Sequence, residues 1–156
     1  MTRHLAPILT IVAVAWSVVI LAAPIGMHDA MSGPAAVVYA VASRICHQKT
    51  DRSFAIAGIQ MPVCARCSGL YLSGALGALL AWTRRGRGPI TSIRTVLFAA
   101  ALPTALTFGL EFLRMVAFSN AARAVAALPL GAAAGWSFVQ MLRYDARFDG
   151  NKILHG

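Results

Sequence analysis

The chain of 156 residues is 58% hydrophobic and only 12% charged. A soluble domain carries about twice that charged fraction, so the composition indicates a membrane protein. The formal net charge of +9 does not indicate nucleic-acid binding, because the cations lie at the ends of apolar runs, where orientation in a bilayer accounts for them. The sequence also lacks a basic patch interleaved with aromatic residues, which nucleic-acid binding would favour.

The first apolar run extends over residues 5–23. At about 19 residues it is long enough to cross a bilayer, whereas the apolar core of a cleaved signal peptide has about 7–15. We therefore predict an uncleaved first span. Residues 35–45 are apolar but too few to span, which predicts a short extra helix that caps the bundle, lies at the interface or re-enters the membrane. Ser32 or Gly33 is expected to start this helix, with Pro34 in its first turn.

The polar stretch over residues 46–67 holds all three cysteines of the chain. Proline is favoured in the first turn of a helix, so Pro62 predicts that a second span begins there and covers 62–82. Cys64 and Cys67 would then lie on one helical face. A helix N-terminus and a nearby cation lower the pKa of a thiol and favour the thiolate, which binds metals and attacks disulfides.

Two further spans are predicted over 93–113 and 121–142, with Ser119 or Asn120 as the cap of the last helix. The second and fourth spans each carry a stripe of small residues, which lets another helix approach closely. The stripes consist of Gly69, Ser73, Gly77 and Ala81 in one helix and Ala127, Gly131 and Gly135 in the other.

These elements predict one all-α domain over residues 1–156, an antiparallel four-helix transmembrane bundle with a short extra interfacial helix and a Cys/His loop. Four spans place both termini and the 83–94 turn on one side. The basic run at 84–87 assigns that side to the cytoplasm by the positive-inside rule, which makes the loop exoplasmic. In either orientation, the polar junction of the third and fourth spans meets the loop at the same membrane surface.

A metal site is the first interpretation of the loop. Three thiolates and one histidine form a common zinc set, so we predict that Cys46, His47, Cys64 and Cys67 bind zinc or a similar divalent metal. Neighbouring side chains diverge, and Cys46 and His47 can reach one ion only on an irregular backbone. The possible substitutes for His47 are His28 and Asp51. Four protein ligands would make the site structural, whereas three would leave a position for a hydrolytic water beside Glu111, the candidate general base or orienting group.

Two alternatives for the cysteines stay open. Cys64 and Cys67 form a CxxC pair, similar in layout to quinone-linked disulfide-generating membrane proteins on an oxidising membrane face. Those proteins generally use two cysteine pairs, whereas this chain has three cysteines, and Cys46 would serve as exchange partner. The other alternative is three separately packed, inert thiols.

A second polar group is expected at the same membrane surface. Arginine suits phosphate geometry, which predicts binding of an anionic lipid headgroup. The simpler alternatives are a Glu111–Arg114 ion pair, a helix cap and a snorkelling cation. No enzyme class is assigned, because the sequence has no Ser-His-Asp set, phosphate loop or dinucleotide-binding glycine pattern. The residues predicted for the anion site are Arg52, Ser53, Arg66, Arg114, Asn120 and Arg123.

The loop also carries a family signature. Its parts are Cys46-His47-Gln48, Arg52-Ser53-Phe54, Gly58 and PVCARCSGLY at 62–71, followed by Ser119-Asn120, Arg123 and Gly131. These motifs resemble the bacterial membrane family called domain of unknown function 2085, and the resemblance covers residues 44–135. It implies a small polytopic protein of the bacterial cytoplasmic membrane, and it implies no activity.

Overall fold

The computed structural model describes residues 4–27, 32–83 and 91–154. Within them the protein is mostly helical, with one small sheet. The elements in chain order are α1 (Leu5–Gly26), α2 (Ser32–Ala42), the 3-10 helix η2 (Thr50–Arg52), β1 (Ser53–Ile56), β2 (Ile59–Cys64), α3 (Ala65–Thr83), α4 (Thr91–Phe112) and α5 (Asn120–Leu154).

Three helices in the described part of the chain are long and apolar enough to cross a membrane: Leu5–Gly26, Ile93–Phe112 and Asn120–Tyr144. They coincide with three of the four predicted spans. The other predicted span, α3, is a helix of 19 residues but is not among these three. Arg66 and the glycines and serines of α3 lower its mean hydropathy. The small residues lie where α3 packs against α5.

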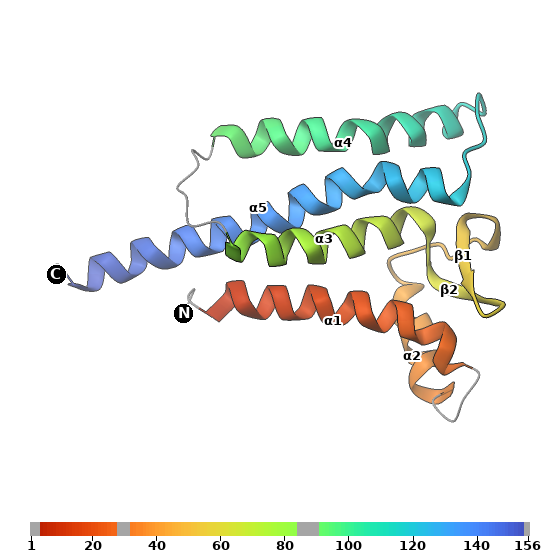
Figure 1. The fold of residues 1–156 in the computed structure, drawn as a ribbon, viewed down its shortest axis with the longest axis horizontal. Helices are drawn as coiled ribbons and strands as arrows, with labels where there is room; N and C mark the ends of the chain where they lie inside the picture. Colours follow the sequence, from red (N-terminus) through yellow and green to blue (C-terminus); the bar gives the residue numbers. More distant parts are fainter. Residues whose placement is uncertain (1–3, 28–31, 84–90, 155–156) are drawn as a thin grey trace.

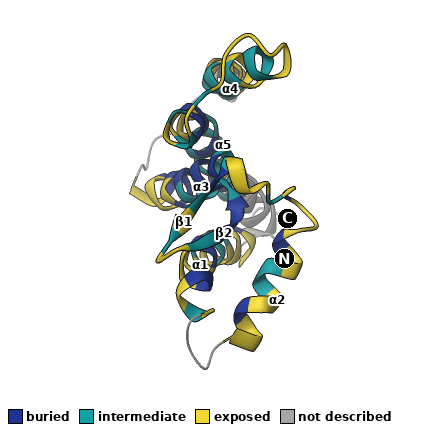
Figure 2. Ribbon diagram, turned by 90° about the vertical axis from the view of Figure 1, so that its right-hand side faces the viewer, coloured by how far each residue is buried: buried dark blue, intermediate teal, exposed yellow. Residues whose placement is uncertain are grey.

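The four long helices lie beside one another in the order α4, α5, α3, α1 (Figure 1). The start of α3 and the junction between α4 and α5 lie at the end of the molecule that also carries α2 and the two strands. The expected convergence of the polar segments at one end is therefore present. Among residues 93–112 of α4 none is buried, since this helix packs mainly on α5 (Figure 2).

The small residues of α3 and α5 form the closest helix contact. A β-carbon at Gly69 or Gly77 would overlap the backbone carbonyl groups of Ala124 or Ala132 in α5. Gly131 and Gly135 face α3 in the same way, against backbone atoms of Leu70 and Gly74. The two predicted stripes are thus confirmed as packing surfaces.

The stretch between Cys46 and α3 corrects the all-α prediction, because β1 and β2 pair as an antiparallel hairpin. Its two turn residues, Ala57 and Gly58, have φ of 51° and 80°, which is the backbone of a tight hairpin turn that matches the twist of the strands. The residue pattern did not predict this turn, since alanine seldom adopts a positive φ.

Pro62 lies in β2, so the predicted helix start at this residue is wrong; α3 begins at Ala65. Proline has no N–H for a sheet ladder, and the pairing of β1 with β2 is irregular between Ser53 and Ala55, the part of β1 opposite it. The backbone carbonyl of Pro62 accepts a 2.8 Å hydrogen bond from Nε2 of Gln48. This contact with a side chain 14 residues away holds the segment in the hairpin.

Candidate functional site

The three cysteines come together from three different elements. Their Sγ atoms all lie within 4.8 Å of one another. Cys46 follows α2, and its N–H donates a 2.9 Å hydrogen bond to the carbonyl of Ala42. Cys64 is the last residue of β2, and Cys67 lies in the first turn of α3. The hairpin therefore replaces the helical turn that was expected to align Cys64 with Cys67.

The thiols lie at the edge of an apolar core. Cys46 is buried, while Cys64 and Cys67 are half-buried. The residues packed around them are Ile20, Ala42, Val63, Trp16 and Tyr71. The N–H of Cys64 donates a 3.2 Å hydrogen bond to Sγ of Cys46. This surrounding leaves few polar partners for the sulfur atoms other than one another.

Cys64 is the thiol with the lowered pKa. A hydrogen bond from the side chain of Cys67 is the main cause, and the backbone of Cys67, the side chain of Cys46 and the backbone of Arg66 add to it. Burial acts in the opposite direction, and the pKa of Cys64 settles at about 5. The expected lowering is thus present at Cys64, where its cause is a set of hydrogen bonds and not the guanidinium of Arg66. It is absent at Cys67, because the hydrogen bond to Cys64 and burial raise the pKa of that thiol.

The fourth predicted ligand stays apart from the sulfur group. His47 is exposed and is not among the clustered donors in the described part of the chain. The side chain of Asp51 is 71% exposed, with a carboxylate oxygen 3.6 Å from Nε of Arg52. His28 lies outside the described residues. The structure therefore brings together three of the four predicted metal ligands.

Beside the thiols, Glu111 at the end of α4 binds two arginines. Its Oε2 accepts a 3.0 Å hydrogen bond from Nη2 of Arg66, and its Oε1 accepts a 2.6 Å bond from Nε of Arg123. The side chain of Glu111 is only 6% exposed. The guanidinium carbon of Arg66 also lies 5.5 Å from the centre of the Phe108 ring. One carboxylate thus joins α3, α4 and α5.

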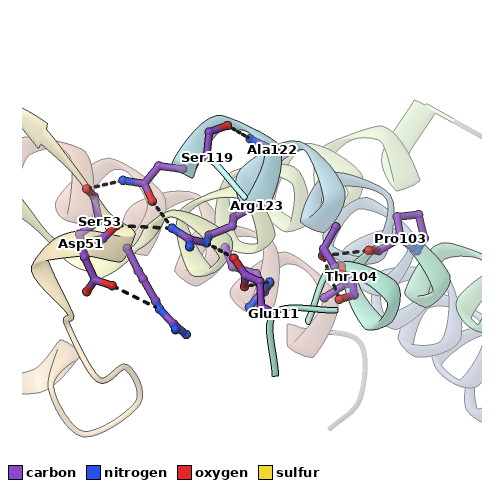
Figure 3. Close-up of polar contacts among 12 residues, drawn as sticks. Asp51, Ser53, Pro103, Thr104, Glu111, Ser119, Ala122 and Arg123 are labelled. Carbon is purple, nitrogen blue, oxygen red and sulfur yellow. Dashed lines mark hydrogen bonds and ion pairs between the residues drawn. The ribbon is translucent and has the colours of Figure 1, made fainter. Parts of the chain in front are cut away.

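The second arginine extends this network to the hairpin (Figure 3). Nη1 of Arg123 donates to Oδ1 of Asn120 at 2.7 Å and to the backbone carbonyl of Asp51 at 3.4 Å. The side-chain Nδ2 of Asn120 donates a 3.0 Å hydrogen bond to the backbone carbonyl of Ser53. The first turn of α5 is therefore tied to the segment that leads into β1.

The alternative of a local Glu111–Arg114 ion pair is wrong, because Glu111 uses both oxygens for Arg66 and Arg123. Arg114 is exposed and its backbone has a φ of 56°. Arg52 is half-exposed beside Asp51, so only two of the four predicted arginines converge.

The remaining polar residues have local roles. Ser53 is buried, and its hydroxyl donates to the carbonyl of Lys49. Ser119 caps α5 by accepting a 3.2 Å hydrogen bond from the N–H of Ala122.

Three residues that the sequence analysis did not single out hold the loop in shape. Nε2 of Gln48 donates to the carbonyls of both Tyr39 and Pro62. The Tyr39 hydroxyl donates to the carbonyl of Gln60 at 2.5 Å, and Nε2 of Gln60 donates to the carbonyl of Gln48 at 2.6 Å. Gln48 lies inside the family signature, which was the available signal. Nothing in the sequence pattern marked Tyr39 or Gln60.

Comparison with known proteins agrees with a membrane protein. A family described as "Predicted membrane protein (DUF2085)" matches residues 46–137. The chain is 51% identical over 43 residues to the uncharacterized protein MJ1492 of Methanocaldococcus jannaschii, which covers 28% of each protein. It is 54% identical over 28 residues to an uncharacterized protein of Methanothermobacter thermautotrophicus, which covers 18% of this chain and 25% of the relative. The chain thus matches about a quarter of the length of these relatives. No solved structure matches it significantly.

Proposed function

Because this chain belongs to the DUF2085 family of predicted membrane proteins, we propose that it is a membrane protein whose Cys46, Cys64 and Cys67 bind one zinc-like ion. The observation that carries the proposal is the grouping of their three Sγ atoms within 4.8 Å. Zinc–sulfur bonds of about 2.3 Å in a tetrahedron place two sulfurs about 3.8 Å apart. The thiols fit such an ion with only a small side-chain adjustment.

The proposed role of the ion is structural. The three ligands lie after α2, at the end of β2 and in the first turn of α3, so one ion would join all three elements. The hairpin has only two strands, and an isolated two-stranded hairpin is marginally stable. Structural zinc sites contribute on the order of 10 kcal/mol to folding, which is enough to fix this segment on the bundle.

The fourth position of the site has two candidate ligands, His47 and a water. His47 would have to turn inward from its exposed position. A water would leave the site open for metal-assisted hydrolysis. Glu111 is the candidate base for that reaction, but both of its oxygens already accept hydrogen bonds from arginines. This pairing favours a positioning role for Glu111 over proton transfer.

The proposal also includes the topology. We assign α3 as a fourth span, which gives an antiparallel bundle with both termini in the cytoplasm and the cysteines on the outer face of a bacterial cytoplasmic membrane. The basic run at 84–87 supports this orientation, although it lies outside the described residues. The two relatives named above are archaeal, so the bacterial origin rests on the resemblance of the motifs.

Metal analysis of the purified protein tests the proposed ion. Protein prepared without chelators and with reduced thiols should contain about one metal ion per chain. Cys64→Ser should lose this metal and expose the segment 46–64 to protease. His47→Ala distinguishes the two candidates for the fourth position, because retention of metal would exclude His47 as an essential ligand. A wild-type protein free of stoichiometric metal would overturn the proposal.

A second candidate is thiol–disulfide exchange, favoured by the low pKa of Cys64 and its contact with Cys46. In this reaction Cys64 and Cys67 would form a disulfide and pass two electrons and two protons to an acceptor of the quinone class. As exchange partner, the Cys46 thiolate would attack this disulfide, forming a mixed disulfide with one cysteine of the pair and releasing the other as a thiol. Mass spectrometry of acid-trapped protein from cells tests it: three reduced thiols and no mixed disulfide would exclude the reaction.

We also propose an anionic lipid headgroup as the ligand of the end of the bundle that carries Arg52, Arg66 and Arg123. The supporting observation is that the buried Nε atom of Arg66 has no hydrogen-bond partner within the described residues, while that of Arg52 has only the 3.6 Å ion pair with Asp51. A phosphate could satisfy them. Native mass spectrometry with anionic lipid tests this, and unchanged lipid retention in Arg52→Ala and Arg66→Ala would exclude the site.

A further inference from the structure

Helix α2 lies across the direction of the long helices. In Figure 2 the view runs along the bundle, so that α3 and α4 are seen from their ends while α2 is seen from its side. The helix packs against α1 and β2. Ala35 and Ala42 are its buried residues, and the Tyr39 hydroxyl fixes it to Gln60. A helix in this position runs parallel to the membrane surface if the long helices cross the bilayer.

The exposed surface of α2 is divided into two flanks. Val37 and Val41 are 62% and 50% exposed, and Ile45, in the turn after the helix, is 56% exposed. They follow one another at intervals of four residues and form an apolar flank. Ala36, Ala40 and Ser43 are exposed on the other flank. One flank thus carries large apolar side chains and the other only small ones, an asymmetry that favours burial of the first flank among acyl chains in the membrane interface.

The charges next to the apolar flank all have one sign. Arg44 and Lys49 are exposed, and residues 32–50 contain no Asp or Glu. Helix α1, which packs on α2, carries the exposed apolar side chain of Ile25 at the same end, and Met27 directly after the helix is also exposed. Both segments therefore expose apolar side chains near the end of the bundle that the bilayer interface would cover, which favours lipid over a protein as the occupant.

We propose that α2 is an in-plane interfacial helix that inserts Val37, Val41 and Ile45 among acyl chains and binds anionic phospholipid headgroups through Arg44 and Lys49. This surface is separate from the thiols and does not depend on a bound metal. The position of α2 in the interface would also set the depth of the thiol site in the membrane, because Cys46 follows directly after Ile45. The thiols would then lie at the level of the lipid headgroups.

Photo-crosslinking of the full chain tests the proposal in nanodiscs with equal amounts of phosphatidylglycerol and phosphatidylcholine. Benzoylphenylalanine is introduced at Val41 or, as a matched control, at the neighbouring exposed residue Ala40. A third variant carries it at Val18, an exposed residue of α1 far from α2 in the sequence. Thermal unfolding verifies that each variant is folded, and mass spectrometry identifies the adducts.

We expect lipid adducts at position 41 and at position 18 but few at position 40. At position 41 phosphatidylglycerol adducts should exceed phosphatidylcholine adducts, and at position 18 they should not. Arg44→Gln and Lys49→Gln should each reduce this excess by about fivefold or remove it, the factor that corresponds to about 1 kcal/mol per cation. Equal lipid labelling at 40 and 41, protein adducts at 41, or no lipid preference there would each overturn the proposal.

Discussion

Glu111 and Arg123 form the shortest ion pair among the described residues, with 2.6 Å between Oε1 and Nε. Both side chains are nearly buried, and the second oxygen of Glu111 binds Arg66. One carboxylate therefore faces two guanidinium groups, and these arginines lie in α3 and in the first turn of α5. The pair holds the ends of three helices in register next to the thiols.

Glu111→Gln should destabilise the protein by about 3 kcal/mol, because removing one partner of a buried ion pair leaves the remaining charges uncompensated. Chemical unfolding in detergent measures the change. Arg114→Gln is the matched control at the same end of α4. Arg114 is exposed, so its replacement should change stability by less than about 0.5 kcal/mol. Equal effects of the two substitutions would show that the ion pairs of Glu111 contribute little.

The same ion pairs show what a sequence can and cannot predict. The apolar runs predicted the helices to within a few residues, except that α5 continues to Leu154, well beyond the predicted end at 142. The alternation of spans predicted that Glu111 and Arg123 meet the cysteine segment. The sequence offered only Arg114, three residues away, as a partner for Glu111, whereas the structure pairs Glu111 with Arg66, which is 45 residues away. Such a choice depends on how α3, α4 and α5 pack, and local spacing does not contain that information.

Pro62 shows a different source of error. Its fixed φ suits both a first helical turn and an extended strand, so the residue alone does not distinguish them. The hairpin is decided by the turn at Ala57 and Gly58 and by side chains distant in sequence, such as Gln48. By contrast, the divergence of adjacent side chains was a sound warning: Cys46 points into the core while His47 is exposed.

The close contact between α3 and α5 predicts that replacing a glycine by alanine has opposite effects inside this contact and at an open glycine of α4. Gly77→Ala should destabilise the protein by about 1–3 kcal/mol, since the added methyl group overlaps the carbonyl of Ala132 and must push the helices apart. Gly109→Ala is the control, because a β-carbon there has no atom within 4 Å. It should raise stability by up to about 1 kcal/mol through helix propensity. Loss of stability of the same size at both sites would contradict the close helix contact.

The proposed orientation predicts which loops an impermeant thiol reagent reaches on intact cells. After the native thiols are blocked, a cysteine introduced at Gly33, at the start of α2, should be labelled. A cysteine introduced at Gly86, between α3 and α4 in the sequence, should be labelled only after the membrane is permeabilised. The reverse pattern would place the termini outside, and labelling of both on intact cells would exclude a fourth span in α3.

The thiol group predicts how Cys64 reacts with pH in the reduced protein without metal. Because its pKa is lowered to about 5, Cys64 should be a thiolate above that pH and lose reactivity toward iodoacetamide only as the pH falls through about 5. An ordinary thiol loses reactivity near pH 8.5. Cys67→Ala removes the main hydrogen-bond donor and should return the midpoint toward the ordinary value. Mass spectrometry of the alkylated peptide gives the midpoint in each protein.

Saturating zinc should then suppress alkylation of Cys64 across the whole pH range, because a metal-bound thiolate is no longer free to react. A midpoint near 8.5 in the wild-type protein, unchanged in Cys67→Ala, would mean that the three thiols do not form the hydrogen-bonded group on which both the metal and the redox proposals depend.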